Sequence, residues 1–184
     1  PIPAISSETD LVPIEFDKLA SEREGHHQLD NGGGPDAFGY RWKDSNEPGG
    51  PTYGWVELAG VGTPLVFTAD DQTLSLTLPW TFSFYGANYT SVNVSSNGNL
   101  HFGVSNSTFS NQPIPTATTP NALLAAWWDD LSPQDQGGQV LYYNDVANSR
   151  FIVQYDSVRS FSGGGRYTFE VLIYQNGRTR YQYQ

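Results

Sequence analysis

The sequence predicts an all-β fold: an antiparallel β-sandwich (jelly-roll/Ig-like) over residues 36–184, preceded by an extended N-terminal arm. Strand-like segments recur about every ten residues from Asp36 onward, which is the spacing of sandwiches and barrels. The 19 Gly and 12 Pro residues supply many tight turns. The 5 Trp, 11 Tyr and 10 Phe residues supply core side chains, and only 15% of the residues are charged, which argues against a disordered chain.

Residues 1–35 differ from the rest in composition and are predicted to form the arm, with a Gly-rich hinge at residues 31–35. Three apolar side chains of the arm alternate with period two, which indicates a short strand: Val12, Ile14 and Phe16. The alternative is a single helical turn lined by Phe16, Leu19 and Ala20.

The first strands of the sandwich are predicted from alternation. Residues 74–78 place Leu at every second position, and residues 80–84 do the same with aromatic side chains. Residues 92–94 and 100–102 flank the dipeptide Asn97-Gly98. Because an Asn-Gly pair supplies the two positive φ angles of a type I′ turn, a hairpin is predicted there.

The later strands follow the same logic. Residues 139–143 and 151–155 pair around a turn-rich segment, and residues 167–173 alternate up to a second Asn-Gly turn, with tyrosines continuing beyond it. Residues 121–131 are ambiguous because Asn121 could cap a short helix. The strands expected on both sides favour a strand there.

Composition excludes several classes of partner and site. The chain contains no Cys, so it has no disulfide and no thiolate metal site. Its net charge of −10 lacks the basic stripe that nucleic-acid binding needs, and no apolar run approaches the ~20 residues of a membrane span. We expect neither nucleic-acid binding nor membrane insertion.

The sequence offers little for catalysis, and we expect no enzymatic activity. His101 alternates with Leu100 and Phe102 on a predicted strand, so its ring is expected to face solvent. His26 and His27 lie in the arm without a zinc-binding spacing around them.

Two pairs of adjacent carboxylates, at residues 70–71 and 129–130, resemble the acid and nucleophile of a glycosidase. Neighbours on a strand point to opposite faces, so neither pair is expected to converge on one bond. One member of each pair could meet in space, which the sequence alone does not show.

Calcium is the cofactor that the sequence favours. Asp44, Asn46 and Glu47 present oxygen ligands just before a Pro-Gly-Gly turn, and Asp36 could join them. The spacing is not that of an EF-hand, since Pro48 and Trp55 stand where that loop needs ligands. The alternative is that Asp44 and Asn46 bond to the turn's own backbone, which needs no metal.

A glycan site is predicted at Trp127, Trp128, Asp129 and Asp130. One indole ring could face outward and stack on a sugar while an adjacent carboxylate bonds the hydroxyl groups. The alternative is that both rings are buried between the sheets.

Several of these segments resemble nidogen-type (NIDO-like) modules. The resemblance rests on residues 82–86, 92–102 and 121–131, and residues 36–51 resemble the start of a module found in secreted bacterial and archaeal proteins. It covers about residues 36–183 and implies an extracellular β-sandwich for adhesion or accessory binding, without catalytic residues. The lack of Cys and Met also suits a secreted, cell-surface location.

Two non-enzymatic functions follow from this reading. In the first, the chain assembles with itself head to tail, and Val12, Ile14 and Phe16 of one copy complete a sheet of the next. Similar modules continue beyond the segment matching residues 178–183, so an open sheet edge is expected. In the second, the chain is a glycan- or surface-binding accessory module.

Overall fold

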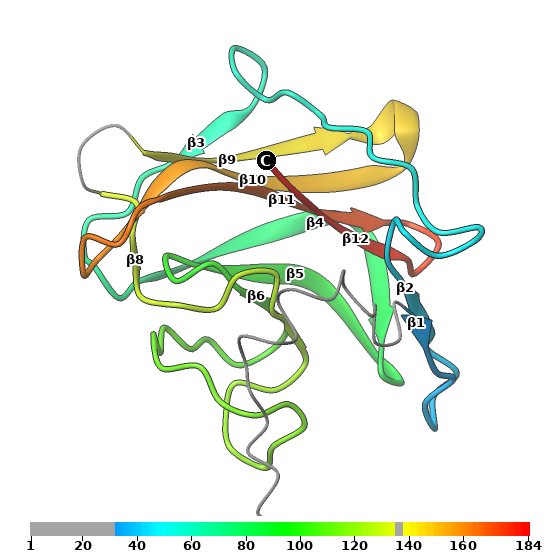
Figure 1. Cartoon of the computed structure of the whole chain (residues 1–184). Helices are drawn as coiled ribbons and strands as arrows, with labels where there is room; N and C mark the ends of the chain where they lie inside the picture. The colour runs from blue at the N-terminus through cyan, green and yellow to red at the C-terminus, as the bar shows by residue number, and fades with distance from the viewer. Residues whose placement is uncertain (1–31, 135–137) are drawn as a thin grey trace, which may run out of the picture. The chain divides into compact units, whose positions relative to one another are not determined.

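The computed structural model describes residues 32–134 and 138–184 (Figure 1). The chain divides into two compact units, Pro1–Pro51 and Thr52–Gln184. In the described part of the first unit, β1 (Gly32–Gly33) pairs antiparallel with β2 (Trp42–Lys43). The proposed donor residues Val12, Ile14 and Phe16 lie outside the described residues.

The second unit consists of two antiparallel sheets, which confirms the predicted β-sandwich. One sheet has the order β12-β11-β10-β9-β3, with β8 also paired to β10, and the other has the order β4-β5-β6-β7. Figure 1 shows the two sheets stacked face to face. The strands of the first sheet are β3 (Thr63–Leu65), β8 (Leu131–Ser132), β9 (Gln139–Asp145), β10 (Arg150–Ser160), β11 (Arg166–Tyr174) and β12 (Thr179–Tyr183). Those of the second are β4 (Thr73–Phe84), β5 (Ala87–Ser95), β6 (Leu100–His101) and β7 (Leu123–Leu124).

The helical content of the described residues is one short 3-10 turn, η1 (Val146–Asn148), between β9 and β10. Residues 121–131 contain β7 and the start of β8 instead of the helix that Asn121 could have capped. Within the ranges 32–134 and 138–184, the structure has no helix that could cross a membrane.

Both Asn-Gly dipeptides lie in hairpin turns, as predicted, but the predicted type I′ geometry is wrong, because neither Asn97 nor Asn176 has a positive φ. Gly98 has φ +77° and Gly177 has φ +88°, a region that glycine enters at little cost. The two segments predicted at 74–78 and 80–84 form one strand, β4, whose pairing with β5 is irregular between Thr77 and Phe82. Pro79 lies within this irregular stretch, where a missing backbone donor is tolerated.

The core between the sheets is aromatic. Tyr155 of β10 stacks on Phe169 of β11 with ring centres 4.5 Å apart, and both are fully buried. The Tyr155 hydroxyl donates to the Ser95 carbonyl of β5 at 2.6 Å. Because this bond joins the two layers inside the core, it fixes how one sheet lies on the other.

The Asn97-Gly98 turn is buried, which is unusual for a hairpin turn. The Asn97 side chain is fully buried and donates from Nδ2 to Asp71 Oδ1 at 2.8 Å and to the Ser107 carbonyl at 3.0 Å. Its Oδ1 accepts from the Leu131 N–H at 3.1 Å, and its carbonyl accepts from the Asp129 N–H. One side chain and its backbone therefore hold three separate segments of chain.

An extended segment, residues 52–58, covers the outer face of the first sheet; we call it the strap. Three side chains in register across neighbouring strands bond to it, and all are buried: Gln154, Glu170 and Gln182. Gln182 exchanges two bonds with Gly54, at 2.7 and 2.9 Å. Glu170 accepts from the Val56 N–H at 3.2 Å, and Gln154 donates to the Val56 carbonyl at 3.0 Å.

The strap also seals an apolar cluster on that outer face. Leu58 packs there with Leu141, Ile152 and Leu172, all of them buried. The first sheet is thus covered on both faces, by the second sheet on one side and by the strap on the other.

We predict that Gly98→Ala destabilises the fold by about 3 kcal/mol or more. A Cβ at Gly98 would lie 1.9 Å from the Trp127 carbonyl oxygen, which is backbone and cannot move aside. Gly177→Ala is the matched control, since that turn has the same sequence and a similar φ but no atom within 4 Å of the added Cβ. Gly177→Ala should lower the free energy of unfolding by only about 1 kcal/mol, the cost of placing a residue with a Cβ in the left-handed region. Urea unfolding of both variants measures the difference; equal costs would contradict the steric argument.

Candidate functional site

Three carboxylates meet where the loop before β4 faces the segment before β8. Each of Asp70, Asp71 and Asp130 offers an oxygen within 4.8 Å of the others. Asn97 donates to Asp71 Oδ1 at 2.8 Å, and Gln134 donates to Asp70 Oδ1 at 3.1 Å. The expectation that neighbouring carboxylates diverge is wrong for Asp70 and Asp71, because they lie in a bend and not in a strand.

The electrostatics of this carboxylate cluster favour a cation. Asp130 Oδ1 is buried and has no hydrogen-bond partner in the part of the chain that the structure describes. Burial, followed by the charges of Asp70 and Asp71, raises the pKa of Asp130. A hard divalent cation prefers such oxygen ligands and would offset the mutual repulsion of the three carboxylates.

The predicted calcium loop is built from hydrogen-bonded turns. Asp36 Oδ1 accepts from the N–H groups of Phe38 and Tyr40, both at 2.9 Å. Asp44 Oδ1 accepts from the Asn46 N–H at 2.8 Å, and the Glu47 carbonyl accepts from the Gly50 N–H at 2.7 Å. Among the described residues, Asp36, Asp44 and Glu47 do not form a three-carboxylate cluster like that of Asp70, Asp71 and Asp130.

The structure leaves little open ring surface at the predicted glycan site. Trp128 is 8% exposed, and its Nε1 donates to the Thr108 carbonyl at 3.0 Å. Trp127 is half-buried, with its ring centre 4.3 Å from that of Tyr167. Asp129 is exposed, and its Oδ1 accepts from the Asp130 N–H. Asp130 belongs to the carboxylate cluster and not to an exposed aromatic platform.

The expectation that His101 faces solvent is wrong, since its side chain is fully buried. Its Nε2 accepts from the Asn106 N–H at 2.9 Å, and Nδ1 lies 3.3 Å from Asn99 Oδ1. This arrangement needs a neutral ring with its proton on Nδ1. Burial lowers the pKa of His101 to about 4. The loop after β6 covers the face that alternation would leave to water.

Glu170 is the second buried titratable group with a large shift. Burial raises the pKa of Glu170 to about 7, although the hydrogen bonds from Val56 and Gln182 act in the opposite direction and lower it. Two acceptors in this row, Glu170 Oε2 and Gln154 Oε1, are buried without partners. Gln154 and Glu170 are cross-strand neighbours on one face, where side chains can share a hydrogen bond. A proton on Glu170 Oε2 is consistent with this environment, because it would provide the donor for such a bond.

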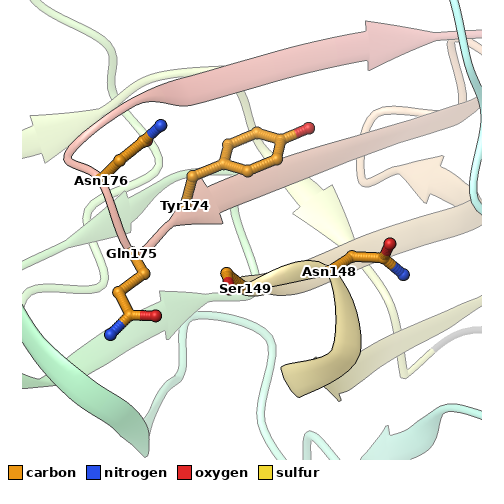
Figure 2. A pocket seen from close by; sticks show the side chains of 5 residues that line it. All are labelled: Asn148, Ser149, Tyr174, Gln175 and Asn176. Carbon is orange, nitrogen blue, oxygen red and sulfur yellow. The ribbon is translucent and has the colours of Figure 1, made fainter.

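A hollow of about 380 Å³ lies between two turns at one end of the first sheet (Figure 2). Asn148 and Ser149 come from the β9–β10 turn, and Tyr174, Gln175 and Asn176 come from the end of β11 and the turn that follows. The Gln175 N–H donates to the Ser149 carbonyl at 2.9 Å and so joins the two turns. Sequence reasoning missed this hollow, because its residues are common in turns.

Comparison with known proteins gives one family. A family model described as NIDO related matches residues 49–184. No curated protein and no solved structure matches the chain.

The two buried titratable groups predict opposite dependences of stability on pH. The pKa of His101 is lower in the folded state than the ordinary 6.5, so its contribution is lost as pH falls from 6.5 toward 4. The pKa of Glu170 is higher than the ordinary 4.5, so its contribution is lost as pH rises from 4.5 through 7.

Glu170→Gln should therefore gain stability relative to the native protein between pH 4.5 and 8, on the order of 2 kcal/mol. Urea unfolding across this range provides the measurement. Asp156→Asn is the control, because that carboxylate makes a solvent-exposed bond to Gln139 on the neighbouring strand. A difference between Glu170→Gln and the native protein that does not change with pH would contradict a protonated Glu170.

Proposed function

The chain belongs to the NIDO-related family, and on that premise we propose that it is a non-catalytic, secreted structural or adhesive protein that assembles head to tail with copies of itself. Such a domain is an extracellular-type module. The proposed link between copies is strand donation, in which the segment with Val12, Ile14 and Phe16 pairs with a sheet edge of the next copy.

The observation that carries this proposal is the open edge of β4. This strand ends its sheet, and among the described residues its only strand partner is β5. Residues 73–77 pair regularly with β5, so the opposite side of this stretch presents a straight row of backbone groups about 17 Å long. An unpaired row of N–H and C=O groups is a template for an added strand.

The donor segment fits this stretch in length and pattern. Residues 12–16 span five positions with apolar side chains at every second one, which matches five residues of β4 edge. Pro13 removes one backbone donor, and position 13 is out of phase with the three apolar side chains. Because donor and acceptor differ, the contact is heterologous and need not close on itself, so repeated donation builds a filament or layer.

Calcium is part of the proposal, as a stabilising ion. Its support is the cluster of Asp70, Asp71 and Asp130, with one buried carboxylate oxygen that lacks a partner. The residues first favoured for this role, Asp44, Asn46, Glu47 and Asp36, carry oxygen ligands of the kind that calcium prefers, and Asp44 and Asp36 also bond to their own turns.

Glycan binding is the second candidate function. At Trp127, Trp128, Asp129 and Asp130 it would use the exposed carboxylate of Asp129 and the open part of the Trp127 ring. The hollow beside Tyr174 offers more polar side chains than this surface does.

We predict that Ile14→Asp abolishes assembly of the full-length chain. A charge at the centre of the donor strand would have to be buried in the acceptor sheet without a partner. Leu11→Asp is the matched control, since it adds the same charge to the same segment out of phase with Val12, Ile14 and Phe16. Sedimentation velocity and electron microscopy of the three proteins measure assembly. Filaments from Ile14→Asp, or equal loss in both variants, would contradict strand donation.

We predict that millimolar calcium raises the melting temperature of the native protein above its value in chelator, by binding only the folded state. Asp130→Asn should raise the melting temperature in chelator, because it removes one of three repelling charges, and should lose the response to calcium. Asp129→Asn, one residue away and exposed, should keep that response. An equal response in all three proteins would remove the carboxylate cluster as the site, and no response in the native protein would remove calcium.

A further inference from the structure

Three arginines gather around one tyrosine beside the hollow, in a chain that has only 9 Lys and Arg residues and a net charge of −10. The guanidinium carbons of Arg178 and Arg180 lie 5.7 and 5.9 Å from the ring centre of Tyr174. Arg150 lies opposite Tyr174 in the register of β10 and β11, and the Tyr174 hydroxyl contributes to the raised pKa of that guanidinium. This end of the sheet is therefore locally positive.

Two of these positive charges have no carboxylate partner among the described residues. Arg150 pairs with Asp145 at 2.6 Å, which is the ion pair found within residues 32–134 and 138–184. Arg180 donates to the Thr52 carbonyl at 3.4 Å, and its Nε is buried without an acceptor. Arg178 is exposed and directly follows the turn that lines the hollow. An unpaired guanidinium in a strongly acidic protein is a place for an external anion.

The hollow beside these arginines has polar walls. Four of its five lining side chains belong to Asn, Gln or Ser, and the fifth, Tyr174, adds an aromatic ring that ends in a hydroxyl group. Figure 2 shows Gln175 and Asn176 on the turn that follows Tyr174, and Asn148 and Ser149 on a second turn nearby. No bond is found within the described residues for the Ser149 hydroxyl or the Gln175 amide, whereas both Asn148 bonds go to Asp145.

We propose that this hollow binds a carboxylate-bearing saccharide, such as a uronic acid unit of an acidic glycan. The guanidinium fork of Arg178 pairs with the sugar carboxylate, and Arg180 adds a second positive charge behind it. The Ser149 hydroxyl and the Gln175 and Asn176 side chains bond the ring hydroxyls, which need several donors and acceptors within a small volume.

The lining favours a saccharide over an acidic peptide. A peptide adds affinity through main-chain pairing with a sheet edge or through apolar side chains in pockets. The hollow lies between two turns and is not lined by β12, the edge strand that follows, and Tyr174 supplies its one ring. Amide and hydroxyl groups line the rest of the hollow, and such groups can bond to the hydroxyl groups that cover a sugar.

This inference does not depend on strand donation or on the Trp127 site. It uses side chains from the β9–β10 and β11–β12 ends of the first sheet, whereas the proposed assembly uses residues 12–16 and the edge of β4. The Ile14→Asp variant should therefore keep the saccharide site. Saccharide binding and assembly can each fail in their own experiment without affecting the result of the other.

The test is titration of the full-length protein with tetragalacturonate, followed by calorimetry and by NMR, with the carboxyl-reduced neutral tetrasaccharide and tetraglutamate as comparison ligands. We expect binding of tetragalacturonate that weakens with added salt, and little binding of the neutral sugar. Arg178→Gln should weaken binding about tenfold through loss of the charge-assisted bonds. The exposed side chain of Arg178 makes the variant safe for folding, which its melting temperature checks.

Arg159→Gln is the matched control, because it removes the same charge from an exposed arginine on β10 of the same sheet. It should leave the affinity for tetragalacturonate unchanged. Absence of binding by the native protein, equal binding of the reduced sugar, equal or tighter binding of tetraglutamate, or an equal loss in Arg159→Gln would each overturn the proposal.

Discussion

The buried Asn97-Gly98 turn is the constraint on which the rest of the sandwich depends. A hairpin turn normally points into water. Here the Asn97 side-chain amide instead forms hydrogen bonds with the loop before β4, the loop after β6 and the segment entering β8. Gly98 lets the Trp127 backbone lie against the turn, and its carbonyl accepts from the Trp127 N–H at 3.2 Å. These bonds bring Asp71 and Asp130 onto one side of the fold, so the carboxylate cluster is a consequence of how the turn is buried.

A second constraint acts on the other sheet, which is covered on both faces. The backbone groups of the strap bond to side chains of the sheet, namely Gln154, Glu170 and Gln182. These side chains satisfy the strap's backbone groups in place of the backbone of a neighbouring strand. Amide and carboxyl groups can be buried there because their bonds to the strap offset much of their desolvation. With both faces used for packing, the surfaces left for partners are strand edges and the turns at strand ends. The hollow at Tyr174 is a surface of the second kind, at the turns of this sheet.

Alternation and turn residues were enough to predict the fold class, but not what covers each face. The Asn-Gly pairs at residues 97–98 and 176–177 were predicted as turns, because the φ requirement is local. Local patterns could not distinguish the buried turn from the exposed one. The prediction for His101 failed for the same reason: alternation assigned its side to water, whereas the following loop returns to bond its ring. The carboxylate cluster needed contacts between residues about sixty positions apart, and no spacing in the sequence encodes such contacts.

The shifted pKa values of His101 and Glu170 also bear on function. The ring of His101 is used to accept a backbone N–H, and the carboxyl of Glu170 is used in the same way for the strap. Perturbed pKa values often mark active sites, but a catalytic base must keep a lone pair free for a substrate proton. Burial explains the direction of both shifts, and each group also accepts a bond from a backbone N–H of the fold. The shifts are therefore accounted for by packing, without reference to a substrate.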